Sequence, residues 1–279
     1  MSFDICDIGQ RQPNRFALRL RAIGGQFTAA QMRVISDIAE RYGKGEIHLT
    51  TRQGIEIHHV HHKDLDAAHA ALEKNNILMG AHGPRVRIVI ACPGEAACRY
   101  GAIDTRAVAA ELDRRYFGMD MPHKVKMGVT GCRHNCGKAR EADIGVMGSL
   151  EPPEWIEEKC LHCNACIETC PVDALSSIDD KHVRDLDKCI RCSTCALNCP
   201  AEAWIAAKRN YKLFVGGTLG KQPRLAGVLK EKIDTKEEFF ELIDRALAFY
   251  KENGQPKERM GSMLTRLGEE QAFEKLLNG

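Results

Sequence analysis

The feature that most constrains this chain of 279 residues is a duplicated run of cysteines. The two runs read CLHCNACIETCP and CIRCSTCALNCP, and both have the spacing C-x2-C-x2-C-x3-C-P. A spacing of two residues lets three thiolates converge from one tight loop, and the proline that follows carries no N–H of its own. The runs therefore predict a small internal repeat folded around metal. Its candidate ligands are Cys160, Cys163, Cys166 and Cys170 in the first run and Cys189, Cys192, Cys195 and Cys199 in the second.

This spacing is typical of bacterial ferredoxins that hold two [4Fe–4S] clusters, in which the fourth cysteine of each run binds the other cluster. A pair of zinc knuckles is the alternative, because C-x2-C is also common at zinc sites. Four cysteines per run, the proline and the duplication favour iron–sulfur clusters. We therefore predict one cluster on Cys160, Cys163, Cys166 and Cys199, and a second on Cys189, Cys192, Cys195 and Cys170.

The composition places these cysteines in an ordinary globular protein. The chain is 44% hydrophobic and 28% charged with a net charge of +2, which predicts no binding to nucleic acid. No segment is long and apolar enough for a membrane span or a signal peptide. Thirteen cysteines without a signal peptide favour metal ligands in a reducing cytoplasm over disulfides. Cys6 is left without a predicted role.

The hydrophobic pattern on either side of the cysteine repeat predicts an α+β fold. Residues 14–23 alternate as a strand does, and Thr28 with Gln31 forms a capping box before a helix. Two strands and a helix capped by Asp64 follow, which gives a ferredoxin-like unit over residues 1–79.

A second unit is predicted over residues 80–150 and 209–235, with the cysteine repeat (151–208) inserted into it. Glu151-Pro152-Pro153 marks the start of that insertion. The predicted strands of the second unit are 86–90, 124–129, 144–147 and 211–215, with a helix at 105–117. Two helices, near 236–251 and 262–277, are predicted in the C-terminal segment 236–279.

A second, looser set of cysteines lies in the loops of this unit. Cys92 and Cys98 stand in ACPGEAACRYG, and Cys132 and Cys136 in TGCRHNCG. By themselves they are consistent with either a third cluster or scattered core thiols.

The segments around these cysteines carry a family resemblance. RLRAIGGQFTAAQM, HLTTRQGIEIHHV, KVKMGVTGC and GCRHNCG, in this order, closely resemble the sirohaem-dependent sulfite and nitrite reductases, and the resemblance covers about Asn14 to Val215. It implies that Cys92, Cys98, Cys132 and Cys136 bind a [4Fe–4S] cluster and that Cys136 is also the axial ligand of sirohaem. The expected cofactors are sirohaem and three [4Fe–4S] clusters. An inserted two-cluster ferredoxin occurs in dissimilatory sulfite reductase subunits and in the sirohaem subunit of anaerobic sulfite reductase.

Three pairs of basic residues predict an anion site. Because side chains alternate along a strand, both members of each pair point to one side, and three neighbouring strands would form a cationic pocket. Such a pocket suits the sirohaem carboxylates and a substrate oxyanion, whereas a solvated strand face is the ordinary alternative. The pairs are Arg19 with Arg21, Arg85 with Arg87, and Lys124 with Lys126.

The resemblance assigns roles within these pairs. It implies that substrate is bound by Arg21, Arg87, Lys124 and Lys126, with Arg87 preferred over Arg85. Arg52, in TTRQG, resembles a sirohaem-contacting arginine, and we expect Arg19 to contact sirohaem as well.

Histidines give weaker signals. A metal role for His58, His59, His61 and His62 is disfavoured, since His58 and His59 point to opposite faces of a strand. His123 and His134 flank the site and are candidates for relaying protons, with His134 preferred.

These residues are compatible with three functions. The leading hypothesis is six-electron reduction of sulfite to sulfide, with the inserted ferredoxin as electron relay. Nitrite reduction to ammonia is the second, and KVK favours sulfite because the resemblance places asparagine at the position of Lys126 in nitrite enzymes. A non-catalytic electron carrier is the third, and it would not need a cationic pocket.

The expected partners follow from what the chain lacks. No G-x-G-x-x-G follows a predicted strand, so the electron donor is expected to be a separate ferredoxin or flavoprotein. Some enzymes of the family that this chain resembles carry two copies of this unit. In them, the basic residues that hold substrate come mainly from one copy, and the cluster cysteines come from the other. The resemblance therefore implies a two-fold dimer, or a homologous partner subunit in place of the second copy.

Overall fold

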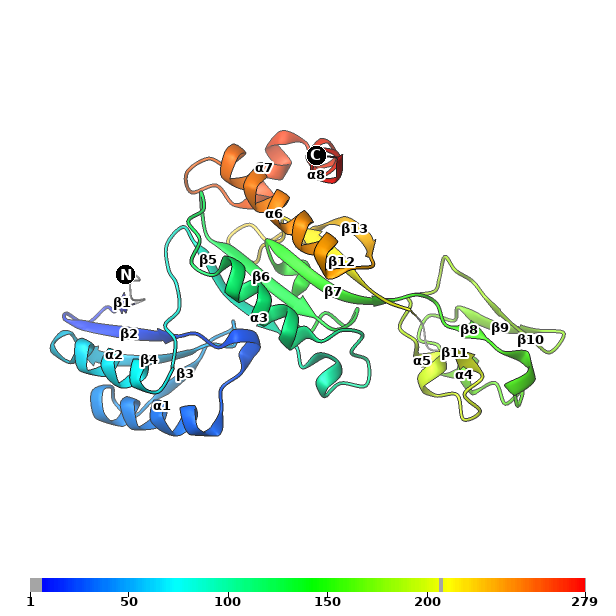
Figure 1. The fold of residues 1–279 in the computed structure, drawn as a ribbon, viewed down its shortest axis with the longest axis horizontal. Helices are drawn as coiled ribbons and strands as arrows, with labels where there is room; N and C mark the ends of the chain where they lie inside the picture. The colour runs from blue at the N-terminus through cyan, green and yellow to red at the C-terminus, as the bar shows by residue number, and fades with distance from the viewer. Residues whose placement is uncertain (1–6, 206–207, 279) are drawn as a thin grey trace.

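The computed structural model describes residues 7–205 and 208–278, so Cys6 lies outside the described residues. Three parts follow one another along the molecule: an N-terminal sheet with two helices, a central sheet with the C-terminal helices, and the cysteine repeat at the far end (Figure 1). Within the described ranges, no helix is both long and apolar enough to cross a membrane.

The N-terminal part is an antiparallel sheet of order β1-β2-β4-β3, with two helices that pack on one face (Figure 1). Its core contains Leu18, Leu20, Ile35 and Ile57, all fully buried. The strands are β1 (Asp7–Gly9), β2 (Arg15–Leu20), β3 (Ile47–Leu49) and β4 (Ile55–His61), and the helices are α1 (Ala29–Tyr42) and α2 (Leu65–Lys74).

Local signals predicted this part well, with two differences. The capping box of Thr28 and Gln31 is present at the start of α1 as predicted. Asp64 does precede α2, but among the described residues its side chain accepts no capping hydrogen bond. A register shift between Phe16 and Leu18 interrupts β2, so that the strict alternation predicted for residues 14–23 does not hold.

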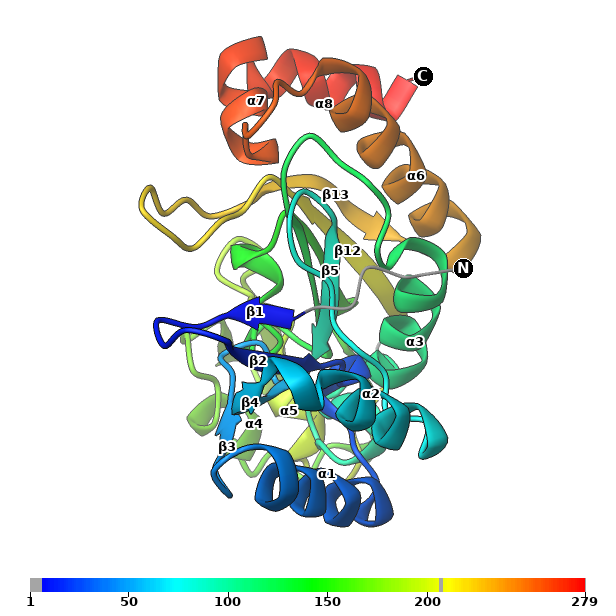
Figure 2. The same cartoon turned by 90° about the vertical axis from the view of Figure 1, so that its left-hand side faces the viewer.

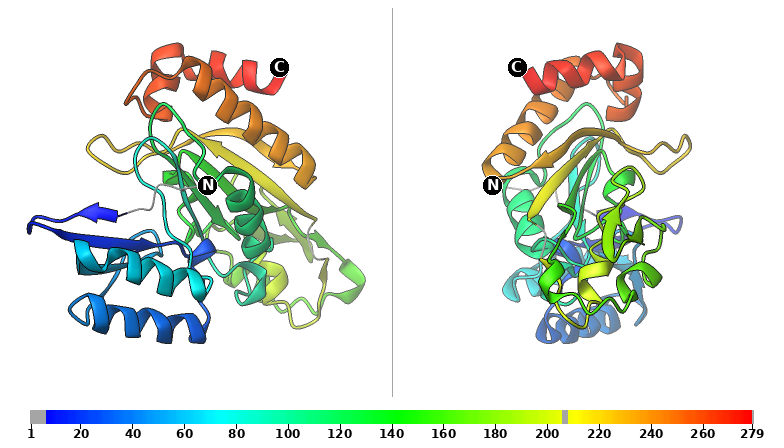
Figure 3. Two further views of the ribbon diagram at one scale, coloured as in Figure 1. Left: turned by 60° about the vertical axis from the view of Figure 1, so that its left-hand side comes forward. Right: turned by 90° about the vertical axis from the view of Figure 1, so that its right-hand side faces the viewer.

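The central part is a five-stranded sheet of order β13-β12-β7-β6-β5. Strands β5, β6 and β7 are parallel, whereas β12 and β13 are antiparallel to their neighbours. Helices α3 and α6 lie side by side over one face (Figure 2, Figure 3). The elements are β5 (Val86–Ala91), α3 (Thr105–Tyr116), β6 (Val125–Thr130), β7 (Ile144–Leu150), β12 (Arg209–Val215), β13 (Gly227–Ile233) and α6 (Lys236–Asn253).

The C-terminal helices share one hydrophobic core with this sheet. Phe239, Tyr250 and Leu264 are buried in the same cluster as Val86 of β5. The prediction of a single helix at 262–277 was wrong, because the chain forms α7 (Met260–Leu267) and α8 (Glu269–Asn278). Gly268 separates them with φ of +82°, a conformation that glycine adopts without strain.

The cysteine repeat is inserted between two neighbouring strands of the central sheet. The chain leaves the sheet after β7, forms the repeat, and returns as β12. Leu150 at the end of β7 pairs with Arg209 at the start of β12, and the repeat lies between them. The short strands β8 and β11 pair at its base, and β9 and β10 form a hairpin. The elements are β8 (Glu154–Trp155), α4 (Ala165–Glu168), β9 (Leu175–Ile178), β10 (Lys181–Arg184), α5 (Thr194–Leu197) and β11 (Trp204–Ile205).

The backbone of the repeat shows the same duplication as its sequence. Residues with positive φ recur in matching positions of the two runs, and a backbone N–H donates to the fourth cysteine sulfur in each, from Ala174 to Cys170 at 3.3 Å and from Ala203 to Cys199 at 3.2 Å. The matching pairs with positive φ are His162 and Arg191, Asn164 and Ser193, and Asp173 and Glu202.

Candidate functional site

Four cysteines gather at the carboxyl ends of β5 and β6. Cys92 follows β5 and Cys132 follows β6, and because these neighbouring strands are parallel, both loops emerge at one edge of the sheet. The Gly131 N–H donates to the Cys92 sulfur at 3.1 Å. Burial raises the pKa of the Cys132 thiol, and the nearby Cys98, Cys92 and Cys136 raise it further. The predicted set of four thiols is therefore brought together.

The loops that carry these thiols are tightly packed. The buried Thr105 hydroxyl donates to the Cys92 carbonyl at 2.6 Å. A Cβ atom on Gly137 would lie 1.8 Å from the Val129 carbonyl oxygen, so only glycine lets the Cys136 loop lie against β6. Cys136 itself is exposed.

This arrangement fits a cluster better than a single ion. No three His, Cys, Asp or Glu side chains of the described ranges are arranged to hold one metal ion. A [4Fe–4S] cluster takes each thiolate on a different iron, so its ligands stand farther apart than those of one ion. Four neighbouring thiols with a backbone N–H aimed at sulfur suit such a cluster.

A group of basic side chains surrounds the opposite end of the same strands. Lys126 lies at the start of β6, Arg259 precedes α7, and both contact Asp143, which is fully buried. Asp143 accepts hydrogen bonds from Arg259 Nη2 at 2.6 Å and from the Lys126 backbone N–H at 2.8 Å. Arg52 Nη2 donates to the carbonyls of Ile88 at 2.6 Å and Met127 at 3.2 Å. We call Arg52, Arg87, Lys124, Lys126 and Arg259 the cation group.

Positive charge within the cation group exceeds what Asp143 can balance. Burial, followed by Arg52, Arg259 and Lys124, lowers the pKa of Lys126 to about 8. Burial also lowers the pKa of Arg52 to about 10, with Asp143 opposing the shift. In the part of the chain that is described, the Arg52 Nε atom is buried and makes no hydrogen bond. Such a site attracts an anion with hydrogen-bond acceptors.

Arg19 and Arg21 lie apart from this group. Arg19 forms an ion pair with Glu56 at 2.6 Å. Arg21 forms a two-pronged ion pair with Asp113 of α3, and its guanidinium stacks 3.5 Å from the centroid of the Phe117 ring. The prediction that three neighbouring strands carry the basic pairs was wrong, because β2 belongs to the N-terminal sheet.

Arg85 and Arg87, of which the resemblance prefers Arg87 for binding substrate, have different surroundings in the structure. Arg85 is paired with Asp120 at 3.0 Å. Arg87 donates to the carbonyls of Ala81 and Gly83 and lies near enough to Arg52 and Lys124 to lower the pKa of each.

Sequence reasoning missed Arg259 and Asp143. The two residues are 116 positions apart, and nothing near Arg259 in the sequence marks it as functional. Asp143 did offer a signal, since a lone carboxylate directly before a buried strand needs a partner.

One of the two predicted groups of repeat cysteines lines a common cavity. Cys170 of the first run lines the same small cavity as Cys189, Cys192 and Cys195 of the second run. This juxtaposition supports the exchange of fourth ligands between the two runs.

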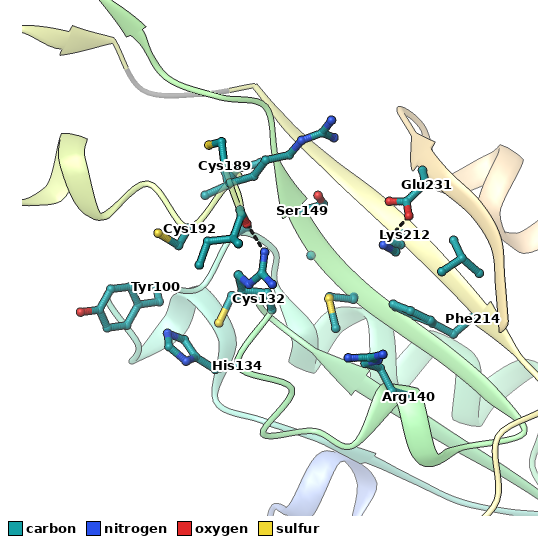
Figure 4. A pocket seen from close by; sticks show the side chains of 18 residues that line it. Tyr100, Cys132, His134, Arg140, Ser149, Cys189, Cys192, Lys212, Phe214 and Glu231 are labelled. Atoms are coloured by element: carbon teal, nitrogen blue, oxygen red, sulfur yellow. Dashed lines mark hydrogen bonds and ion pairs between the residues drawn. The ribbon is translucent and has the colours of Figure 1, made fainter. Parts of the chain in front are cut away.

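The second run faces the Cys132 loop across a cavity of about 320 Å³ (Figure 4). Cys132, His134, Cys189 and Cys192 line this cavity, and His134 lies against the ring of Tyr100. Arg133 donates to the Ile190 carbonyl, and Arg99 Nη2 donates to Asn198 Oδ1 at 3.3 Å. These bonds hold the repeat against the loops of the central sheet.

The fold and these sites define an iron–sulfur protein of mixed α+β fold, and comparison with known families agrees. Residues 82–278 match the family described as the nitrite and sulphite reductase 4Fe-4S domain. Residues 8–75 match the nitrite/sulfite reductase ferredoxin-like half domain. The chain belongs to the nitrite and sulfite reductase family.

Individual relatives show the same relationship. The chain is 34% identical over 268 residues to the coenzyme F420-dependent sulfite reductase of Methanocaldococcus jannaschii, covering 95% of this chain and 43% of that protein. It is 30% identical over 193 residues to one of the subunits of the anaerobic sulfite reductase of Salmonella typhimurium, covering 61% of this chain and 56% of that subunit. It thus spans about half the length of these curated relatives.

The fold is shared with a solved enzyme. The crystal structure of dissimilatory sulfite reductase I superposes with a TM-score of 0.79 at 19% identity, covering 94% of this chain and 69% of that one.

Proposed function

We propose that this protein reduces sulfite to sulfide with the help of sirohaem and a [4Fe–4S] cluster. The observation that carries the proposal is the surplus of charge in the cation group, where Arg52, Lys124, Lys126 and Arg259 surround a single buried carboxylate, Asp143. A pure electron carrier has no need of such an anion site. The relatives named sulfite reductases support sulfite as the anion.

The reaction consumes six electrons and six protons per sulfite and releases three waters. The cation group binds the sulfite oxygens and orients them, and its fixed positive charge favours the negative charge that develops during reduction. Lys126, with a pKa of about 8, holds a proton at neutral pH and can donate it to a departing oxygen. When bound, sirohaem supplies the iron at which the sulfur is reduced.

We propose that sirohaem would be held by Cys136 of one copy and Arg52 of the second copy. The exposed Cys136 thiol would bind its iron, and the buried Arg52 Nε would suit a carboxylate oxygen. Arg19 and Arg21 are engaged by Glu56 and Asp113 through Nε and Nη2, so we assign neither of them a leading role at the site.

The cysteine repeat is proposed to be a two-cluster ferredoxin that relays electrons to the Cys132 loop. The crossed grouping around Cys170 and the contact between the second run and that loop support this role. Its donor would be a reduced ferredoxin or flavoprotein. So many thiolate ligands also require a reducing compartment, which we take to be the cytoplasm.

A complete active site is proposed to need a second copy of this unit. Lys126 stands six positions before Cys132, and six residues of extended chain span about 20 Å. Lys126, at the amino end of β6, and Cys132, beyond its carboxyl end, are therefore separated along the strand. A two-fold dimer, or a homologous subunit, would place one copy's cation group over the other copy's Cys136.

The direct test is anaerobic purification followed by assay of iron, sirohaem and turnover. Three clusters predict about twelve cluster iron atoms per chain. With reduced viologen as donor, sulfite should be turned over faster than nitrite. Faster turnover of nitrite would assign the chain to nitrite reduction, and absence of the sirohaem absorption bands would overturn both enzyme functions.

Substituting Lys126→Asn should lower kcat/KM for sulfite by about a hundredfold or more, because a preorganised cation is lost from the anion site. We expect a smaller loss for nitrite. The measurement is steady-state reduction of both substrates with reduced viologen, with the exposed Lys44→Asn as control. Equal, small effects on the two substrates would contradict a role of Lys126 in binding sulfite.

The affinity for sulfite should fall as pH rises through about 8, because Lys126 then loses its proton and its charge. Below that pH the ammonium is intact and binding is strongest. The Lys126→Arg variant keeps its positive charge, so its KM for sulfite should not rise at higher pH for this reason. The ratio of KM in the variant and the wild type, measured from about pH 7 to about pH 9.5 on either side of that pKa, cancels the ionisation of sulfite itself. A ratio that does not change with pH would show that Lys126 does not titrate in this range.

A further inference from the structure

Strand β10 places alternate side chains against both cysteine runs of the repeat. His182 Nε2 lies 3.5 Å from the sulfur of Cys160, in the first run. Arg184 Nη2 donates to the sulfur of Cys195, in the second run, at 3.7 Å. Because residues two apart share a face of a strand, one face of β10 reaches sulfur atoms of both predicted clusters. The two clusters therefore have different neighbours.

The guanidinium of Arg184 is fixed in place. Its Nη1 donates to the Pro153 carbonyl, and its central carbon lies 4.7 Å from the centroid of the Trp204 ring. Arg184 is partly buried, whereas Lys181 on the same strand is exposed. A cation held in this way acts on the sulfur with little screening by water.

We propose that Arg184 raises the reduction potential of the second-run cluster above that of the first-run cluster. This inference rests on the proposed ferredoxin function of the repeat. A cluster that accepts an electron gains negative charge, so a fixed cation and an N–H donor at its sulfur stabilise the reduced form more than the oxidised form. On the first-run side, the same face of β10 presents the imidazole of His182 in place of a guanidinium.

The order of potentials agrees with the position of each run. Cys163 of the first run is exposed, whereas Cys189 and Cys192 of the second run line the cavity shared with Cys132. A single electron from a reduced donor protein would reduce the first-run cluster, pass to the second-run cluster and leave towards the Cys132 loop. Each transfer oxidises one cluster and reduces the next, and Arg184 makes the first internal transfer downhill.

The test is an anaerobic redox titration of the full holoprotein at one fixed pH, followed by electron paramagnetic resonance. The wild type should show two repeat clusters with unequal potentials, and Cys192→Ser should remove the one with the higher potential. Arg184→Gln should lower that higher potential by about 59 mV or more, which corresponds to a tenfold change in a one-electron equilibrium. Arg184→Lys keeps the charge and should retain most of the difference.

The matched control is Lys181→Gln, which removes the same charge from the other face of β10. A shift no larger in Arg184→Gln than in this control would overturn the inference. Equal or reversed potentials in the wild type would also overturn it, whether or not Arg184→Gln assembles its clusters. A wild-type protein without repeat clusters would refute the ferredoxin function itself, and the inference with it.

Discussion

Replacing Cys136 with serine is expected to abolish sulfite reduction, with a loss of about a thousandfold or more in kcat. The proposed role of Cys136 is to hold the cluster and sirohaem together, so that electrons pass between them without crossing a gap. Because the thiol is exposed, a serine should leave the fold intact. The measurements are turnover with reduced viologen, sirohaem absorption and iron per chain.

Cys163→Ser is the matched control for this prediction, because Cys163 is also exposed but lies in the cysteine repeat. That variant should lose iron from the first-run cluster while keeping its sirohaem bands. With viologen, which can reduce the inner clusters directly, it should retain much of its activity. Normal turnover and unchanged sirohaem bands in Cys136→Ser would rule out the axial role.

The elements with strong local signals were predicted from the sequence. The capping box of α1 lies within four residues, and the parallel strands β5 and β6 are nearly continuous apolar runs. The short strands of the cysteine repeat were not predicted, and two edge strands of the larger sheets were missed. β1 has three residues, and β13 reads GVLKEKI, with charges that are usual at a sheet edge but hide the strand pattern. The break at Gly268 was missed although glycine is the usual residue just beyond a helix end.

The residues of the candidate site also differ in how well the local sequence predicted them. The cysteines of the repeat were recognised by spacing, because each run places its ligands within a few residues of one another, whereas Cys92, Cys98, Cys132 and Cys136 were identified through the family resemblance. The position and ion pair of each arginine depend on residues that are distant in the sequence. Arg21 pairs with Asp113, and Arg259 pairs with Asp143, at separations of 92 and 116 residues that no local pattern reports. A periodic pattern gives the direction of a side chain along its own strand, but the opposite charge that binds it comes from the tertiary fold.

The placement of the two residue sets also explains why one chain should not suffice. Along β6, Lys126 at the amino end and Cys132 beyond the carboxyl end are separated by an extended strand that lies between two neighbours in the sheet. This separation is the ground on which a second copy is proposed. Pairing two copies about a two-fold axis brings the sets together without any change within the chain.

Mixing two inactive variants is therefore expected to restore activity. In a dimer of Lys126→Asn with Cys136→Ser, one of the two shared sites takes intact cations from one chain and intact cysteines from the other. Random exchange makes about half of the dimers mixed, so about a quarter of wild-type turnover should return.

The control for this experiment mixes Lys126→Asn with Lys124→Ala. Both changes lie in the cation group, so every shared site in a mixed dimer carries one of them and no recovery is expected. Exchange is verified with differently tagged chains, and sirohaem content is measured alongside turnover. If tagged dimers have exchanged and the first mixture stays inactive, each site must be complete within one subunit. Recovery in the first mixture alone would show that the cation group of one chain acts over the Cys136 of its partner.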